Sequence, residues 1–184
     1  MKICDHNLNE KIFIVAEIGN NHEGDFQTAL ELVEAASTTG VNAIKFQTFI
    51  PEKYYASSES TRIETLKKFQ LSNDNLKEIR NFAISKGLIF FSTPFDLESA
   101  RFLNPLQDLF KISSGDNTFW PLIKEVASYR KSTIISTGAS GFKELDRIYY
   151  YFKDKELLNK LSFLHCVSSY PVPKEQANLL MIKK

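Results

Sequence analysis

Residues 41–48 have the sequence VNAIKFQT, in which an apolar run ends at Lys45. The same pattern recurs at residues 109–114, LFKISS, where Lys111 follows an apolar pair and small polar residues follow the lysine. Short apolar runs of this kind are typical of buried β-strands. Strands that end at a cation, a hydroxyl or a carboxylate build one polar pocket from many strand ends, and two lysines in it favour a small anionic substrate.

Strand-like runs recur along the chain, and each is followed by turn residues and then by a segment with helical periodicity. The six runs cover residues 12–18, 42–47, 88–92, 109–112, 132–136 and 161–166. Helices are expected at residues 26–36, 73–86, 97–103, 119–129 and 141–152, with a last one that begins near Lys174. This alternation is the pattern of a parallel sheet built from βα units, so the sequence predicts an α/β fold.

Start and stop signals mark two of these helices. Asp25 is the expected N-cap of the first helix, because its side-chain oxygen satisfies a free backbone N–H group. Gly40 is the expected stop of that helix, since glycine tolerates a positive φ. Asn73 or Asp74 opens the second helix and Gly87 closes it.

Five of the strand-like runs start apolar and end polar. Their polar end residues are Glu17, Lys45 with Gln47, Ser92 with Thr93, Lys111, and Ser136 with Thr137. In α/β folds the carboxyl ends of parallel strands hold the ligand, because helix N-termini and βα loops converge there. All five sets are therefore expected on one rim. Residues 48–72 exceed a typical connection of about 4–6 residues, which predicts an ordered insertion or a lid over that rim.

The count of six βα units leaves two architectures open. A closed (β/α)₈ TIM barrel needs eight units, so the sequence predicts a barrel that is incomplete here, with strands seven and eight missing and two unpaired edges. An open doubly wound sheet accommodates six strands, but it normally has a glycine-rich phosphate loop after one of them. The nearest stretches, residues 113–116 and 136–141, are small-residue turns that offer backbone N–H groups to an anion.

The composition is that of an ordinary globular domain, with 43% hydrophobic and 24% charged residues in a chain of 184. The formal net charge is +1 and the charges are scattered, so we expect neither nucleic acid nor a membrane surface as a partner. The apolar run at residues 12–18 is far shorter than the ~20 residues of a membrane-spanning helix, and no signal peptide is recognised. Two cysteines cannot form a disulfide framework, which favours a reducing cytoplasm.

Metal and hydrolase chemistry receive no support from the sequence. The three histidines, His6, His22 and His165, share no close spacing with one another or with the cysteines, so no metal-ligand cluster is recognised. The Gly-x-Ser-x-Gly turn of a hydrolase does not occur either.

The charged strand-end residues each have a structural and a chemical interpretation. Glu17, a carboxylate at the end of an apolar strand, suits a general acid or base, or it forms a structural ion pair with Lys45 or Lys111. The two lysines bind phosphate or carboxylate oxygens, or one is a Schiff-base nucleophile as in barrel aldolases, or they extend past the strand ends as surface residues. His22 is a ligand, a proton carrier or a brace of the turn that follows Glu17.

Six short motifs at the strand ends occur in a recognisable order. They are residues 16–24 (AEIGNNHEG), 45–48 (KFQT), 92–95 (STPF), 111–115 (KISSG), 135–138 (ISTG) and 164–171 (LHCVSSYP). In this order they resemble the motifs of the N-acetylneuraminate (sialic acid) synthases, whose related members make legionaminic and pseudaminic acids or act in spore-coat polysaccharide synthesis. The resemblance covers nearly the whole chain and is specific for the family, though not for the sugar.

The resemblance implies a TIM barrel followed by a small antifreeze-like domain. Family members condense phosphoenolpyruvate with an open-chain N-acetylhexosamine, such as N-acetylmannosamine, and release phosphate by C–O cleavage to give a nine-carbon 2-keto acid. They use a divalent metal, Mn²⁺ or Mg²⁺. By resemblance, Glu17 is the catalytic carboxylate that handles a proton during water addition. The residues that fall on substrate-binding positions are Lys45, Gln47, Thr93, Lys111, Ser114, Ser136, Ser168 and Tyr170.

The resemblance also sets expectations about the rest of the protein. Ser168 lies where some members have an asparagine that helps bind phosphoenolpyruvate. The two metal-binding histidines of the family lie in strands seven and eight, beyond Lys184, so no metal ligand is expected within this chain. Residues 1–184 are expected to be a partial barrel that lacks the antifreeze-like domain and is inactive alone, from a protein that is a homodimer at full length. The alternatives are a non-catalytic phosphoenolpyruvate-binding remnant and a Schiff-base aldolase.

Overall fold

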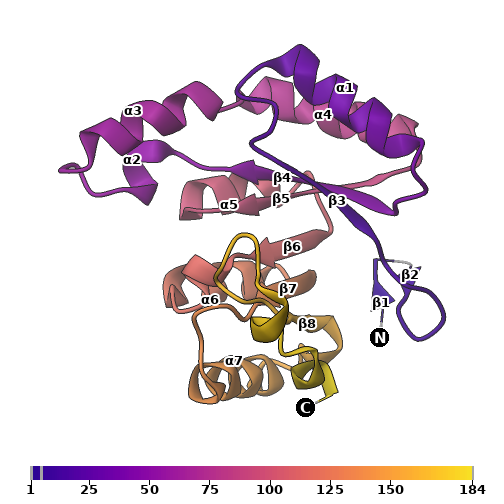
Figure 1. The fold of residues 1–184 in the computed structure, drawn as a ribbon, viewed down its shortest axis with the longest axis vertical. Coiled ribbons are helices and arrows are strands. Elements are labelled where there is room, and N and C mark those ends of the chain that lie inside the picture. Colours follow the sequence, from indigo (N-terminus) through magenta and orange to yellow (C-terminus); the bar gives the residue numbers. More distant parts are fainter. Residues whose placement is uncertain (1, 5, 184) are drawn as a thin grey trace.

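The computed structural model of the chain describes residues 2–4 and 6–183. Its main body alternates parallel strands and helices (Figure 1). The parallel strands are β3 (Val15–Gly19), β4 (Ala43–Thr48), β5 (Ile89–Pro94), β6 (Leu109–Ile112), β7 (Ser132–Ser136) and β8 (Leu161–Leu164). The helices that follow them are α1 (Phe26–Ser37), α4 (Asn73–Ser85), α5 (Leu97–Leu103), α6 (Trp120–Ser128) and α7 (Phe142–Asp154). The predicted α/β fold with parallel strands is confirmed.

The strands form two parallel sheets of three, β3-β4-β5 and β6-β7-β8, each in chain order. Figure 1 shows the first sheet above the second, with β5 and β6 at their junction. At this junction the side-chain amide of Gln107 accepts from Ser92 N at 2.7 Å and donates to Ser92 O at 3.0 Å. One buried side chain therefore takes the place of a strand ladder between the sheets.

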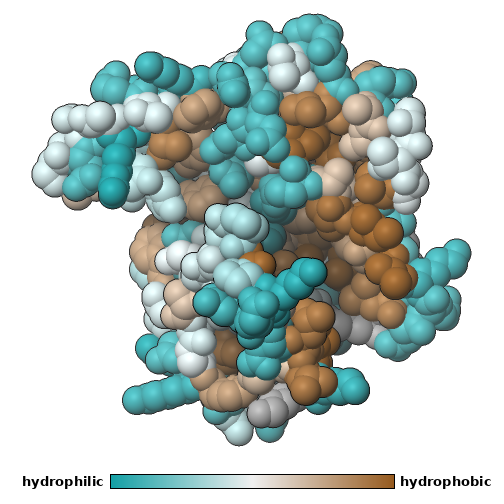
Figure 2. Space-filling model, in the orientation of Figure 1, coloured by the Kyte–Doolittle hydropathy of each residue, from teal (hydrophilic) through white to brown (hydrophobic). Residues whose placement is uncertain are grey.

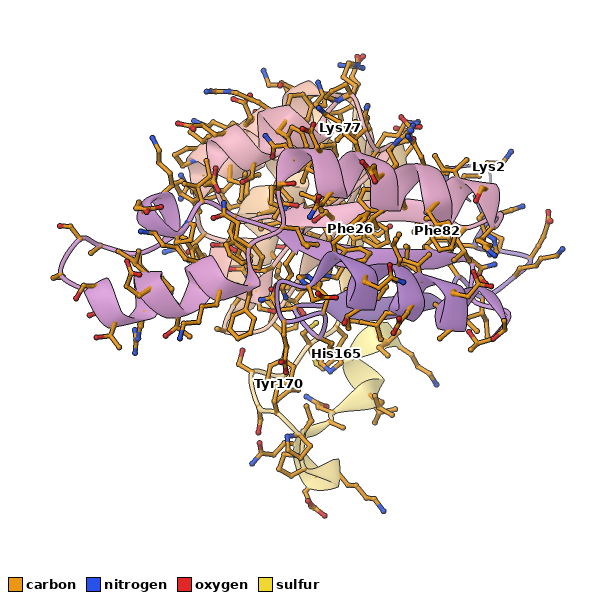
Figure 3. The ribbon with its side chains drawn as sticks, turned by 90° about the horizontal axis from the view of Figure 1, so that it is seen from above. Lys2, Phe26, Lys77, Phe82, His165 and Tyr170 are labelled. Carbon is orange, nitrogen blue, oxygen red and sulfur yellow. The ribbon has the colours of Figure 1, made fainter. Side chains whose placement is uncertain are left out.

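Three clusters of buried side chains hold the layers together. One lies between β3–β5 and helices α1 and α4, where Figure 3 shows Phe26 and Phe82, and another lies between β6–β8 and helices α5, α6 and α7. The third lies on the opposite face of both sheets and contains Ile3, Ala43, Phe91, Leu109 and Ile134. Because side chains alternate along a strand, Ile44 and Phe46 face the helices, whereas Lys45 faces inward with the third cluster.

The helix signals of the sequence are found where they were expected. Asp25 is the N-cap of α1 and accepts a hydrogen bond from Thr28 N at 2.6 Å. The second helix begins at Asn73, and its N-cap is the preceding residue, Ser72, which accepts from Asn75 N. Gly40 and Gly87 follow the two helices with φ of +81° and +77°.

The expected insertion at residues 48–72 is ordered. It contains α2 (Pro51–Tyr54) and α3 (Ser60–Phe69). Lys53 of α2 forms an ion pair with Glu98 of α5 at 2.8 Å, and the carbonyl of Lys68 in α3 lies against Gly24 in the β3–α1 turn. The insertion therefore contacts both α5 and the β3–α1 turn. Its action as a lid over the rim stays a prediction.

Two features of the chain ends differ from the prediction. The hairpin of β1 (Lys2–Ile3) and β2 (His6–Asn7) was missed, because two-residue strands have no readable periodicity. The helix expected from Lys174 is wrong: the segment forms two short 3₁₀ turns, η3 (Lys174–Gln176) and η4 (Leu179–Lys183). No residue of either turn is buried, so no packing stabilises a longer helix there.

The outer limits of two strands also differ. The first parallel strand begins at Val15 rather than at residue 12, and Ile12 and Ile14 are exposed. The sixth ends at Leu164, so Cys166 lies in the loop that follows rather than in the strand.

Candidate functional site

The inward faces of the strands surround a cavity of about 460 Å³. Its wall is mainly apolar, with Phe91 and Ile134 among the lining residues, and it contains the charged side chains Glu17, Lys45 and Lys111. Figure 2 shows hydrophobic residues gathered in the recess between the upper and the lower sheet. The acid and the two lysines, which are far apart in the sequence, thus meet at one cavity, as expected for strand ends on one rim.

Lys45 on β4 is the most buried charged group of this cavity, with 4% of the residue exposed. Its ammonium group lies 2.8 Å from Glu17 Oε2 and donates a hydrogen bond of 3.1 Å to Thr93 Oγ1. Strand register explains both contacts. Lys45 pairs with Glu17 on β3 and with Phe91 on β5, and Thr93 lies two residues after Phe91 on β5. Burial lowers the pKa of Lys45, and Glu17 opposes this shift. The structural ion pair considered for Glu17 is therefore present, although 54% of the Glu17 side chain is exposed.

Lys111 on β6 faces the same cavity from the second sheet. Burial is the main cause that lowers the pKa of Lys111, and the charge of Lys45 lowers it further. None of the ion pairs found among the described residues includes Lys111. Two ammonium groups that repel each other, one of them unpaired by a carboxylate, give the cavity a preference for an anion.

Three of the candidate hydroxyl residues lie around the turn after β7. Gly138 N donates to Ser114 Oγ at 3.2 Å. A Cβ atom on Gly138 would lie 2.7 Å from Ser114 Oγ and 2.8 Å from Ser168 Oγ, so a larger residue there would displace the two serine hydroxyls. Ser136, the last residue of β7, is buried, and its Oγ has no hydrogen-bond partner among the described residues.

The other two candidates lie differently. Gln47 is half-buried on β4 and pairs in register with Thr93 on β5, so it lies at the same strand ends. Tyr170 is 95% exposed on the C-terminal segment, and Figure 3 shows that segment outside the layers of strands and helices. The structure therefore gathers eight of the nine candidates near the rim and leaves Tyr170 in solvent.

Sequence reasoning did not single out two buried polar residues of the short helix η1 (Ser114–Asp116) and its C-cap. Asp116 is buried and accepts a hydrogen bond from Ser113 Oγ, and burial raises the pKa of Asp116. Asn117 is buried and donates to two carbonyls of the turn after β7. The available signal was the run of small polar residues after Lys111, which was interpreted as a source of backbone N–H groups and of the Ser114 hydroxyl, without Asp116 or Asn117.

His22 braces the turn after β3, which is one of the three roles considered for it. Its Nδ1 accepts a hydrogen bond from Gly24 N at 3.0 Å, and its ring stacks on Phe46. Burial lowers the pKa of His22, which favours the neutral ring that this hydrogen bond requires.

The residues described do not by themselves fit a divalent metal. Over residues 2–4 and 6–183, no group of three or more His, Cys, Asp or Glu side chains could hold a metal ion.

Within the same residues, no helix has the length and apolar character required to cross a membrane.

The fold and the rim define an α/β protein with parallel strands whose carboxyl ends bring an acid, two lysines and several hydroxyls to one cavity. The profile of the NeuB family matches residues 32–184, and the chain belongs to the NeuB family.

Relatives of known sequence agree with this assignment. The chain is 40% identical over 175 residues to an uncharacterized protein of Methanocaldococcus jannaschii, covering 95% of this chain and 51% of that protein. It is 38% identical over 185 residues to the N,N'-diacetyllegionaminic acid synthase of Legionella pneumophila, covering 91% and 52%. It is 31% identical over 185 residues to the N-acetylneuraminate-9-phosphate synthase of Mus musculus, covering 94% and 51%. The chain thus spans about half the length of the curated relatives it matches.

Solved structures give the same result. The N-acetylneuraminic acid synthetase of Leptospira borgpetersenii, solved in complex with citrate, superposes with a TM-score of 0.90 at 31% identity, covering 95% of this chain and 61% of that one. A truncated 3-deoxy-D-arabino-heptulosonate 7-phosphate synthase of Thermotoga maritima superposes with a TM-score of 0.61 at 14% identity, covering 82% and 50%, and shows the fold alone. The resemblance to the sialic acid synthases is therefore confirmed.

Proposed function

We propose that the full-length protein condenses phosphoenolpyruvate with an open-chain N-acetylhexosamine, such as N-acetylmannosamine, to a nine-carbon 2-keto sugar acid and phosphate. The observation that carries the proposal is the meeting of Glu17, Lys45 and Lys111 at one cavity. Phosphoenolpyruvate has a phosphate and a carboxylate, which two ammonium groups complement. The synthases of legionaminic acid and of N-acetylneuraminate 9-phosphate among the relatives support this reaction class. The product would serve nonulosonic acid or surface polysaccharide biosynthesis.

Electrostatics supports the assignment of Lys45 and Lys111 to the anionic groups of phosphoenolpyruvate. Burial lowers the pKa of both lysines, and the charge of Lys45 lowers the pKa of Lys111 further. A bound anion would stabilise the charged form of each lysine. We assign hydrogen bonds to the same substrate to residues at the surrounding strand ends and loops, namely Gln47, Thr93, Ser114, Ser136 and Ser168. Among the described residues the buried hydroxyl of Ser136 has no partner, which supports this assignment because such a hydroxyl is unfavourable until an acceptor arrives.

Glu17 is assigned the proton transfer. In the condensation, C3 of phosphoenolpyruvate bonds to the aldehyde carbon of the sugar, water adds to C2, and the bond from C2 to the phosphate oxygen breaks. When C2 becomes a carbonyl, one proton of the added water leaves with the phosphate. The other proton of the water must be lost to balance the one that the former aldehyde oxygen gains. Glu17 is the carboxylate among the residues that line the cavity, which makes it the candidate for this proton. Tyr170 is assigned a contact near the substrates, which requires the loop after β8 to move inward.

We also propose that two further βα units complete a TIM barrel and that an antifreeze-like domain follows. The support is that β3 and β8, the first and last strands in the order, each have no neighbour on one side among the described strands. Phe163 and Leu164 on β8 are 39% and 45% exposed, as apolar residues at an uncovered edge are. The ligands of a divalent metal, Mn²⁺ or Mg²⁺, are proposed to lie in those units, and the full-length protein is proposed to be a cytoplasmic homodimer.

The test is an assay with phosphoenolpyruvate, a panel of N-acetylhexosamines and Mn²⁺, in which phosphate release and the mass of the product are measured. We expect turnover by the full-length protein and none by residues 1–184 alone. Absence of phosphate release from every sugar with the full-length protein would contradict the condensation, and turnover by residues 1–184 would contradict the missing barrel units. If the full-length protein binds phosphoenolpyruvate in calorimetry but turns over none of the sugars, the result would support a non-catalytic binding remnant.

A Schiff-base aldolase is the second candidate, because burial lowers the pKa of Lys45 and Lys111 and a Schiff-base lysine must be neutral to attack a carbonyl. Reduction with borohydride in the presence of pyruvate would trap such an adduct. If the protein is such an aldolase, mass spectrometry of a peptide digest will find the added mass on one of these two lysines. An unlabelled protein removes this candidate and leaves the condensation.

A further inference from the structure

We propose that Asn117 is a positioning residue, which fixes the turn at residues 136–138 so that Ser136 presents its hydroxyl to the ligand. The inference rests on the proposed use of Ser136 in phosphoenolpyruvate binding. Asn117 is 3% exposed and is the C-cap of η1, the short helix after β6. Its Nδ2 donates to Ser136 O and to Gly138 O, both at 3.0 Å.

These two hydrogen bonds use both hydrogens of one amide nitrogen. The acceptors are carbonyls two residues apart in the turn after β7, so a single side chain holds both ends of that turn. Because η1 follows β6 and the turn follows β7, Asn117 joins two neighbouring loops of the rim. The position of one loop therefore determines the position of the other.

A third contact between the same loops fixes their spacing. Gly138 N donates to Ser114 Oγ, and a Cβ on Gly138 would lie 2.7 Å from that oxygen. Ser136 O, Gly138 O and Gly138 N thus each have a partner in or next to η1, whereas Ser136 Oγ has none among the described residues.

Ser136 lies on the face of β7 that is turned toward the cavity. Ile134, two residues earlier on β7, lines the cavity, and residues two apart on a strand share a face. Ser136 is 2% exposed, so its hydroxyl does not reach bulk water. Asn117 holds the carbonyl of Ser136 and so fixes the backbone from which the hydroxyl projects, where a ligand oxygen can accept from it.

Binding of phosphoenolpyruvate by variants of the full-length protein tests this role. Asn117→Leu keeps the volume and removes both donors, and we expect it to raise the dissociation constant about tenfold, with a larger change in KM than in kcat. Thr118→Ala, an exposed neighbour in the same loop, is the matched control and should bind as the wild type does. Urea unfolding of each variant confirms that a folded protein is compared.

Two further variants separate positioning from a structural role. In the background of Ser136→Ala, Asn117→Leu should cost little additional affinity, because its effect passes through Ser136. Asn117→Asp donates a hydrogen bond only when its carboxyl group is protonated. We therefore expect the ratio of its dissociation constant to that of the wild type to fall from pH 8 to pH 5.5, whereas the ratio for Asn117→Leu stays constant. If Asn117→Leu does not fold, Asn117→Ser, which keeps one donor, takes its place in the cycle.

The outcomes distinguish this inference from the proposed function. A wild-type protein that does not bind phosphoenolpyruvate contradicts the proposed function and this inference together. A wild type that binds, with folded Asn117 variants of equal affinity or with effects that add fully to Ser136→Ala, contradicts the positioning role alone.

Discussion

Lys45 shows how a single charge is accommodated at this site. The ammonium group is buried on β4, and burial of a charge is tolerated only with partners. Glu17 supplies the opposite charge at 2.8 Å and Thr93 supplies a hydroxyl, but the Glu17 carboxylate is half in solvent. The pair therefore lies at the boundary between the cavity and water, where a ligand anion can compete for the lysine.

Lys45→Met tests the importance of this charge for binding. Methionine keeps the length of the side chain and removes the ammonium group, and hydrogen bonds to charged groups contribute about 1.5–3 kcal/mol. We expect the dissociation constant for phosphoenolpyruvate to rise roughly 10- to 100-fold in calorimetry. Lys53→Met is the control, because Lys53 is exposed and pairs with Glu98 on the surface. Equal affinity of the Lys45 variant and the wild type would refute the assignment.

The lowered pKa values of Lys45 and Lys111 predict two opposite pH dependences. Between these lowered values and 10.5, the usual value, the unfolded chain binds more protons than the folded one. The free energy of unfolding without ligand should therefore rise with pH in this window. The affinity for phosphoenolpyruvate should fall in the same window, because the ammonium groups lose their charge.

Measurements above pH 8 check this, since a phosphate group with a second pKa near 6 no longer changes charge there. Lys111→Met should flatten both profiles. An affinity that stays constant up to pH 10.5 would argue against binding by these lysines.

At the scale of elements, α3 is fixed to the β3–α1 turn by a close backbone contact. A Cβ on Gly24 would lie 1.9 Å from the carbonyl oxygen of Lys68, and Gly24 has φ of +83°. Both the space and the backbone conformation therefore require glycine. This contact ties the insertion at residues 48–72 to the segment that carries Glu17.

Gly24→Ala is expected to destabilise the protein more than Gly40→Ala. Gly40 has nearly the same φ, +81°, but nothing lies within 4 Å of an added Cβ, so its substitution measures the conformational cost alone. That cost is about 1–2 kcal/mol for a left-handed residue, and Gly24→Ala should add a similar amount or more from the steric clash. Urea unfolding gives both values, and equal losses would show that α3 yields to the added methyl group.

The helices and strands were largely readable from local pattern. Asp25, Gly40 and Gly87 mark helix ends through chemistry that acts within a few residues, and the structure has these ends. A helix was also predicted from Lys174, yet that segment forms only 3₁₀ turns because no buried face stabilises a helix there. Local propensity decides an element only where tertiary packing agrees with it.

At the scale of the whole molecule, the two sheets are joined through Gln107. Its amide bonds both backbone groups of Ser92 on β5, and the side chain is buried just before β6. The relative position of the sheets determines how far Lys45 on one lies from Lys111 on the other. Gln107 therefore contributes to the shape of the cavity without lining it.

Gln107→Leu should be strongly destabilising. It leaves the N–H and the carbonyl of Ser92 buried without partners, at about 1–3 kcal/mol each. Gln70→Leu is the matched control, because Gln70 is exposed and loses a single hydrogen bond to Phe49 O. The free energies of unfolding in urea check the difference, and equal losses for the two variants would contradict the role of Gln107 as a joint.

The sequence by itself determined the α/β class, the order of the strands' polar ends, and the family, because these follow from periodicity and from short motifs of adjacent residues. Only the tertiary structure decided that Glu17 pairs with Lys45 rather than with Lys111, that Gln107 joins the sheets, and that Asn117 holds the turn after β7. These contacts join residues from 15 to 28 positions apart, and their distances depend on strand register and on how the two sheets pack. No local pattern carries that information, since register and packing result from the burial of the whole core.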